Sequence, residues 1–132
     1  MRETIELTGM VLKATPVGDY DRRLVILTRE RGRITAFARG AKRPGNLLMA
    51  VCRPFVFGIF RVYEGRDAYN LHSAEVRNYF TELAEDVEAT CYGSYFLEFA
   101  EYYSRENLDG GELLLLLYQS LRALLKPALP NS

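Results

Sequence analysis

The sequence predicts an α+β protein, a five-stranded OB-type β-barrel followed by α-helices. Apolar and polar residues alternate in short segments through residues 1–80, as they do in half-buried strands. Glycines interrupt two of these segments, which is typical of strands that bend around a barrel. From residue 81 onward the apolar residues recur at helical spacing instead. We therefore expect two domains, a barrel over residues 1–80 and a helical segment over residues 81–132.

The first strand is expected over residues 5–15, where apolar side chains alternate between two faces. Gly9 in its middle predicts a bulge or a sharp bend, as where a strand turns a barrel corner. The residues of the two faces would be Ile5, Leu7 and Val11 on one side and Met10 and Leu12 on the other.

Residues 22–44 hold the stretch on which the functional interpretation depends. The pattern predicts a β-hairpin followed by a basic loop: an apolar run at 24–27, a charged turn closed by Gly32 and a second apolar run at 34–38. Side chains alternate on the second strand, so its two faces differ. One face is apolar, with Ile34, Ala36 and Ala38, and the other carries Arg33, Thr35, Phe37 and Arg39.

Two further strands complete the predicted barrel. Before them we expect a short helix that begins at Asn46. The fourth strand is then expected over residues 55–64, with Gly58 inside it. A tight turn at 65–67 leads into the fifth strand, residues 68–77. A helix between the third and fourth strands is the arrangement of an OB barrel.

Two helices are expected after the barrel. Thr81 would cap the first, which runs to residues 104–107 and is apolar on more than one side. Its two apolar stripes would be Val87, Cys91, Tyr95, Glu98 and Tyr102, and Tyr92, Phe96, Phe99 and Tyr103. The second helix follows Gly110 and Gly111, and its main face would be Leu114, Leu117, Tyr118, Leu121 and Leu125, widened by Leu113, Leu115, Leu116 and Leu124. Such wide apolar surfaces indicate part of a larger helical domain or a surface covered by a partner.

Composition narrows the functional classes. The chain has 132 residues, of which 48% are hydrophobic and 26% charged, as in ordinary globular proteins. No apolar run approaches the ~20 residues of a membrane span, and we expect a cytoplasmic protein. Cys52 and Cys91 are expected to be core thiols, and with the single His72 they predict no metal site within this chain. No nucleophile, base or phosphate-binding motif is present, so we expect no enzyme activity and no cofactor.

The net charge of zero conceals two opposite halves. Residues 1–80 hold 14 Lys and Arg against 8 Asp and Glu, a balance of +6, whereas residues 81–132 hold 3 against 9, a balance of −6. A basic barrel with an aromatic ring on a cationic strand face is what a sequence-tolerant single-strand binder needs. Two other interpretations remain open: a solvated strand whose arginines keep an edge soluble, and two halves that attract each other.

Three segments resemble the RecO family of bacterial recombinational repair mediators. They are GMVLKATPVGDYDRRLVILTRERGRITAFARGAKRP, RPFVFGIFRVYEGRDAYNLHSAEV and YGSYFLEFAEYY, within residues 8–103. The resemblance implies an N-terminal OB barrel that binds single- and double-stranded DNA, and a helical domain with a zinc module. It also implies strand annealing and, together with RecR and single-strand-binding protein, loading of RecA.

The resemblance assigns DNA-binding roles to a small set of residues. Those on the third strand and its exit loop are Arg33, Arg39, Lys42 and Arg43, and Arg22 and Arg23 follow the loop between the first two strands. The pattern of the strand face itself adds Phe37, whose ring would stack on a base. It implies that Asp21 caps that loop rather than touching DNA. Ala50 and the Cys52–Arg53 pair depart from the family pattern, so local packing there is expected to differ. The cysteine cluster of the zinc module is absent from this sequence.

The predicted function is that of a DNA-binding recombinational repair mediator. Two alternatives from other classes remain. In one, the barrel is a scaffold and the tyrosine-rich helices form a protein-interaction module. In the other, the chain is an RNA-binding OB domain, which would use the same cations and ring.

Overall fold

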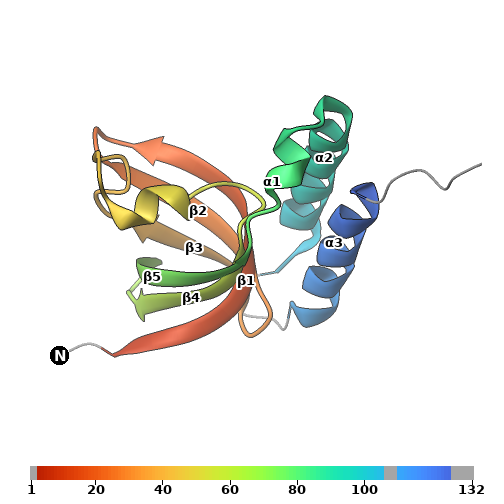
Figure 1. The fold of residues 1–132 in the computed structure, drawn as a ribbon. Helices are drawn as coiled ribbons and strands as arrows, with labels where there is room; N and C mark the ends of the chain where they lie inside the picture. The colour runs from red at the N-terminus through yellow and green to blue at the C-terminus, as the bar shows by residue number, and fades with distance from the viewer. Residues whose placement is uncertain (1–2, 106–109, 126–132) are drawn as a thin grey trace, which may run out of the picture.

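The structure is a computed structural model of the protein and describes residues 3–105 and 110–125. Its strands are β1 (Thr4–Val17), β2 (Asp21–Thr28), β3 (Gly32–Ala38), β4 (Phe57–Glu64) and β5 (Tyr69–Asn78). A 3-10 helix, η1 (Leu47–Ala50), lies between β3 and β4. The helices α1 (Thr81–Ala84), α2 (Val87–Tyr103) and α3 (Gly111–Leu124) follow the last strand and form a layer beside the barrel (Figure 1).

The strands close into a barrel in the order β1-β2-β3-β5-β4. All neighbours are antiparallel except β3 and β5, which pair in parallel through Ala36–Tyr69 and Phe37–Asn70. The long β1 closes the barrel because its first half pairs with β4 and its second half with β2. Together with η1 between β3 and β4, this order confirms the predicted OB-type barrel followed by helices. The division into domains at residue 80 stays a prediction.

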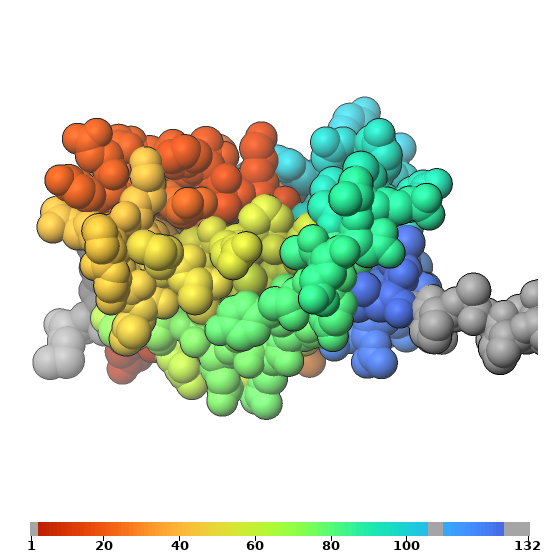
Figure 2. Space-filling view, turned by 45° about the horizontal axis from the view of Figure 1, so that its top comes forward, coloured from red at the N-terminus to blue at the C-terminus, as the bar shows by residue number. Residues whose placement is uncertain are grey.

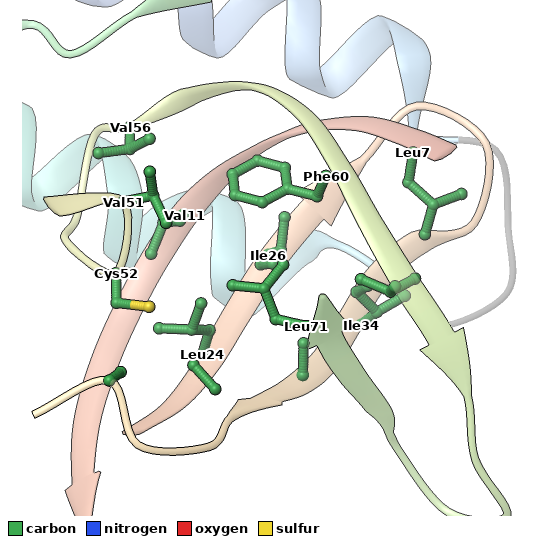
Figure 3. Close-up of a cluster of buried hydrophobic side chains, with 14 residues drawn as sticks. Leu7, Val11, Leu24, Ile26, Ile34, Val51, Cys52, Val56, Phe60 and Leu71 are labelled. Atoms are coloured by element: carbon green, nitrogen blue, oxygen red, sulfur yellow. The ribbon is translucent and has the colours of Figure 1, made fainter. Parts of the chain in front are cut away.

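One hydrophobic core fills the barrel (Figure 3). Inward-facing side chains from all five strands meet there, and Phe60 at the centre is fully buried. The segment after η1 closes one end of the barrel with Val51, Cys52 and Val56. The expected faces of β3 are confirmed, since Ile34 and the two alanines at 36 and 38 are buried in this core.

A second core joins the barrel to the helices. Its barrel members come from the outer face of β1 and β2, and its helical members line the inner sides of α1, α2 and α3. The large, fully buried members are Met10, Leu27, Phe80, Leu83 and Leu121. The expected main face of α3 is confirmed, because Leu114, Leu117 and Leu121 are buried here.

The two faces of β1 are as expected, with Leu7 and Val11 in the barrel core and Met10 and Leu12 in the second core. The irregularity in the strand lies between Val11 and Lys13, not at Gly9. Gly9 has a different role. A Cβ atom there would lie 2.6 Å from the carbonyl oxygen of Leu27, so the close approach of β2 requires glycine.

The fourth strand begins at Phe57, two residues later than the predicted 55. Phe55 has a φ of 76°, which is outside the extended region and prevents the strand from starting there. Its backbone N–H still donates to the Val11 carbonyl, at 3.0 Å. Its ring lies against Gly93 of α2, where an added Cβ would be only 3.0 Å from the ring. Phe55 therefore anchors the barrel to α2.

The prediction that Thr81 caps one long helix was wrong. The N-cap of α1 is Phe80, which makes no side-chain cap hydrogen bond, and the helix ends after four residues. A new helix, α2, then starts from Asp86, whose carboxylate accepts the N–H of Ala89 at 3.1 Å. The Thr90 hydroxyl donates to the Leu83 carbonyl and joins the two helices. Asp86 is the stronger cap because its side chain accepts an N–H group of the first helical turn, which has no partner within the helix.

The predicted apolar stripes of α2 are also not its buried face. The buried residues are Ala89, Gly93, Leu97 and Ala100, which permit close packing on the barrel. Of the aromatic side chains in these stripes, Phe96 packs partly buried against the second core and the others face outward, with Tyr95 66% and Tyr102 75% exposed. Cys91 is exposed as well, which corrects its assignment as a core thiol, whereas Cys52 is buried as expected.

In residues 3–105 and 110–125 no helix is long and apolar enough to cross a membrane.

Candidate nucleic-acid interface

Two loops at one end of the barrel bring a ring and three cations together. The first connects β1 to β2 and ends in Tyr20, and the second leaves β3 through Arg39, Lys42 and Arg43. The Lys42 N–H donates to the Tyr20 carbonyl at 2.8 Å, which fixes the loops to each other. The Arg43 guanidinium carbon lies 4.2 Å from the centroid of the Tyr20 ring. We call these four residues the basic edge.

Asp21 holds the second loop in place. Its carboxylate accepts the N–H of Gly40 at 2.7 Å and lies 3.5 Å from the Arg39 guanidinium. Gly40 has a φ of 72°, a conformation that glycine adopts without strain, so the chain can turn away from β3. Asp21 therefore caps a loop, as the sequence predicted, but it is the loop after β3 and not the loop that Asp21 follows.

Phe37 lies beside the basic edge on the outer face of β3. The Arg39 guanidinium carbon is 5.5 Å from the centroid of its ring. Arg23 is its register partner across the β2–β3 ladder, so the two side chains share that face. The ring is half-buried, with a partly accessible surface between two cations.

Arg33 belongs to a different part of the molecule. Its guanidinium donates to the carbonyl oxygens of Glu101 and Ser104, the second at 3.2 Å, at the end of α2. Its backbone N–H donates to the carbonyl of Arg105 at 3.0 Å. These carbonyls are the groups that a helix C-terminus leaves without partners, and a cation there also interacts favourably with the helix dipole. Arg33 therefore connects β3 to α2.

A polar cleft separates the outer face of β2 and β3 from α2. It has a volume of ≈ 520 Å³ and is lined by Arg23, Val25, Arg33, Thr35, Glu98, Glu101 and Tyr102. Two arginines on the barrel side face two glutamates on the helix side. Among the described residues no ion pair spans the cleft, since Arg33 donates to the backbone carbonyl of Glu101 and not to its carboxylate, so the attraction between a basic and an acidic half stays a prediction. The carboxylates make the cleft a poor path for a polyanion.

Arg22 faces the barrel end rather than the outer surface. It shares the inward side of β2 with Leu24 and Ile26, and its register partner is the buried Ala38. Its buried Nε atom has no hydrogen-bond partner among the described residues. Burial raises the pKa of the nearby Cys52 thiol to about 11, although the Arg22 guanidinium acts to lower it.

The structure thus groups the predicted site residues into three places. Arg39, Lys42, Arg43 and Phe37 lie at or beside the basic edge with Arg23 next to them, Arg33 lies at the end of α2, and Arg22 lies at the barrel end. Sequence reasoning missed Tyr20. Its signal was an aromatic residue in a loop of turn-forming residues next to the basic hairpin.

Within residues 3–105 and 110–125 no three His, Cys, Asp or Glu side chains gather as metal ligands would. The predicted absence of a metal and of a cofactor stays a prediction, as do the DNA-binding roles of the seven residues.

Comparison with known proteins places the chain in a family. Residues 1–80 match the family described as "Recombination protein O N terminal". A protein named "DNA repair protein RecO" from Alkaliphilus metalliredigens is 34% identical over 122 residues, which are 92% of this chain and 50% of that protein. Proteins of the same name from Bacillus pumilus and Exiguobacterium are 33% and 30% identical over 91% and 90% of this chain, and over 47% and 48% of their own lengths. The chain therefore spans about half the length of these relatives. By its matching barrel and these relatives, the chain belongs to the RecO family of DNA repair proteins.

Proposed function

We propose that the chain binds single- and double-stranded DNA through the basic edge, as part of a recombinational repair mediator. In this proposal the whole protein anneals complementary strands and, with RecR and single-strand-binding protein, loads RecA. The observation that carries the DNA-binding step is the joining of two loops that present Arg39, Lys42 and Arg43 around the ring of Tyr20. The names of the relatives support the role in repair.

The proposed mechanism is electrostatic and involves no covalent change. The three cations neutralise phosphates, while Tyr20, which is 49% exposed, offers a ring to a base. Phosphate contacts carry no sequence information, so the interface tolerates any sequence. Two complementary strands held near one basic surface repel each other less, which is how the chain would promote annealing. No cofactor takes part.

The number of cations sets the expected salt dependence. Each neutralised phosphate of a single strand contributes a slope of about −0.7 to the plot of log K against log[salt]. Four cations, counting Arg33, would give a slope of roughly −3. The Arg33 guanidinium is held by the carbonyls of Glu101 and Ser104, so we propose that three cations act and that the slope is about −2.

The test is fluorescence anisotropy of a labelled single strand, titrated with the protein at low and near-physiological salt. The triple variant Arg39→Ala, Lys42→Ala, Arg43→Ala should lose most of the binding and most of the salt slope. The matched control Arg29→Ala, Arg66→Ala, Arg77→Ala removes the same charge from exposed positions outside the basic edge and should retain both. Equal losses in the two triple variants would reject the basic edge as the site. Competition with RNA of the same sequence separates DNA binding from the RNA-binding alternative.

One observation favours a second role, that of a protein-interaction surface. The outer side of α2 exposes Tyr92, Tyr95 and Tyr102, and large exposed aromatic residues are typical of contact surfaces. We propose this face for contact with RecR or single-strand-binding protein. Capture of either purified protein should survive Arg39→Glu with Lys42→Glu and should fall with Tyr95→Ala and Tyr102→Ala. The reverse pattern would place the partner on the basic edge.

A further inference from the structure

The 3-10 helix η1 presents two apolar side chains to solvent. Leu47 is 91% exposed, the largest fraction of any large apolar side chain in the described part of the chain, and Met49 is 40% exposed. Single exposed leucines are common on protein surfaces. Two together at the tip of one short element need a further explanation, which the surroundings of η1 provide.

Hydrogen bonds and packing against the barrel fix the conformation of η1. Asn46 caps it by accepting the Leu48 N–H at 2.7 Å, and the N–H groups of Val51 and Cys52 both donate to the Leu48 carbonyl at 3.2 Å. Leu48 packs against the barrel core. A 3-10 helix has three residues per turn, so the neighbours of Leu48 project on either side of it and away from the barrel. Leu47 and Met49 are therefore exposed because of the backbone geometry and not by fraying.

Cations flank this apolar tip along the chain on both sides. Lys42 and Arg43 precede it, the Asn46 N–H donates to the Arg43 carbonyl at 3.1 Å, and Arg53 follows it on the exposed surface. Residues 31–63 contain no Asp or Glu. Arg31, Arg33 and Arg61 of this segment are held by Glu64, the end of α2 and Glu6, so the cations left for the neighbourhood of η1 are Arg39, Lys42, Arg43 and Arg53. Figure 2 shows the yellow segment around η1 spread across one face of the molecule, next to the orange segment of the preceding loop.

We propose that Leu47 and Met49 form a wedge that inserts between base pairs where a duplex opens into single strands. Leucine and methionine are among the residues that proteins insert between base steps, with lysines and arginines holding the flanking phosphates. Unstacking costs least at a duplex end or fork, so the wedge selects that structure. The inference rests on the proposed DNA binding and adds to it a preference for junctions. Because η1 is already fixed, insertion requires little additional ordering of the protein.

The test uses the whole 132-residue chain and a forked duplex with 2-aminopurine at the junction. Binding should raise the fluorescence of the unstacked base. The variant Leu47→Ser, Met49→Ser should abolish most of that rise and weaken fork binding at least about tenfold, the lower end of the scale for burial of one apolar side chain. Its affinity for a plain single strand and its salt slope should be unchanged. The control Leu115→Ser, Leu116→Ser alters two side chains on α3 that are each 57% exposed and should behave like the wild type.

The outcomes separate the wedge from the proposed function. If the wild type binds single strands with the expected salt slope but does not brighten 2-aminopurine, the wedge is overturned and DNA binding stands. If the wild type binds no DNA even at low salt, both fail. If the serine variant instead loses binding to phosphatidylglycerol vesicles while the fork signal is intact, the apolar tip contacts lipid and the wedge is again overturned.

Discussion

The Arg33 guanidinium donates a hydrogen bond to the carbonyl oxygen of Glu101, 68 positions further along the chain. The same guanidinium reaches the carbonyl of Ser104, so one barrel side chain closes the end of α2. At the turn of the same hairpin, the N–H of Gly110 donates to the Arg29 carbonyl at 3.1 Å. The β2–β3 hairpin is thus held by the end of α2 and by the residue before α3, and the barrel and the helices support each other.

Replacing Arg33 should therefore lower stability more than DNA affinity. Arg33→Ala removes two charge-assisted hydrogen bonds, and the carbonyls of Glu101 and Ser104 keep only the longer bonds from the Ser104 hydroxyl, at 3.3 Å, and from the Arg105 guanidinium, at 3.5 Å. Each charged hydrogen bond is worth about 1.5–3 kcal/mol, so we expect the free energy of unfolding to fall by about 2–3 kcal/mol. Urea unfolding followed by circular dichroism measures it.

Arg23→Ala is the matched control for this variant, because Arg23 lines the same cleft and its side chain makes no hydrogen bond or ion pair with the described residues. Its free energy of unfolding should change by less than about 0.5 kcal/mol. The Arg33 variant should also keep the wild-type salt slope. A slope reduced by about 0.7 with unchanged stability would instead mean that Arg33 contacts a phosphate.

Much of the fold could be predicted because its signals are local. The alternation in β3, the Asn46 cap and the leucine face of α3 each depend on residues close in sequence. The start of α2 was missed because Thr81 and Asp86 are both acceptable caps. In the structure the carboxylate of Asp86 accepts the Ala89 N–H, whereas α1 has no side-chain cap hydrogen bond.

The site was harder to predict because its contacts join distant segments. Backbone carbonyls at the end of α2 have no sequence signature, so nothing in the local pattern distinguished Arg33 from Arg39. Tyr20 was missed for the same reason, since its meeting with Arg43 depends on how two loops close. Arg22 and Arg23 were assigned to the site together, although neighbouring residues of a strand point to opposite faces and only Arg23 shares the outer face with Phe37.

Tyr20 should contribute to binding through its ring. Tyr20→Ala removes the surface on which a base would stack and leaves Arg43 without its aromatic neighbour. Stacking on one aromatic side chain is worth about 1–3 kcal/mol, so single-strand affinity should fall by roughly 5- to 150-fold. Anisotropy titration measures it, with stability expected to change little because Tyr20 is 49% exposed.

Tyr20→Phe distinguishes the ring from the hydroxyl and should bind within about twofold of the wild type. The salt slope should be the same in all three proteins, since the number of phosphate contacts does not change. An alanine variant with wild-type affinity would exclude Tyr20 from the interface and leave binding to the cations alone.

Gly58 should be intolerant of any side chain. It lies in β4, where an added Cβ would be 2.3 Å from the carbonyl oxygen of Glu75 and 2.9 Å from the Cα of Val76. Both obstacles are backbone, so the β4–β5 ladder must separate, and Gly58→Ala should cost about 3 kcal/mol or more of unfolding free energy. Gly18→Ala is the comparison, since Gly18 has a φ of 61° and open space around it, and should cost only about 1–2 kcal/mol. Thermal unfolding that ranks the two variants in the opposite order would contradict the close approach of β5 to β4 at Gly58.

Cys52 should make the protein less stable in alkaline solution. Burial raises the pKa of its thiol from an ordinary value of 9.0 to about 11, although the Arg22 guanidinium acts in the opposite direction. Between these values the unfolded chain loses the thiol proton while the folded chain keeps it, so rising pH favours unfolding. The stabilisation is complete below pH 9 and is lost as pH rises through about 11, with a total on the order of 2 kcal/mol.

Cys52→Ala isolates this effect from the ionisation of tyrosines and lysines in the same range. Its side chain is small and cannot ionise, so the difference in unfolding free energy between wild type and variant should be constant from pH 6 to about 8.5. Above that range the difference should shrink, because only the wild type loses the contribution of the buried thiol. Urea titrations at closely spaced pH values measure it. A difference that stays constant to pH 11 would mean that Cys52 ionises as readily in the folded protein as in the unfolded chain, and that the end of the barrel closed by η1 admits water.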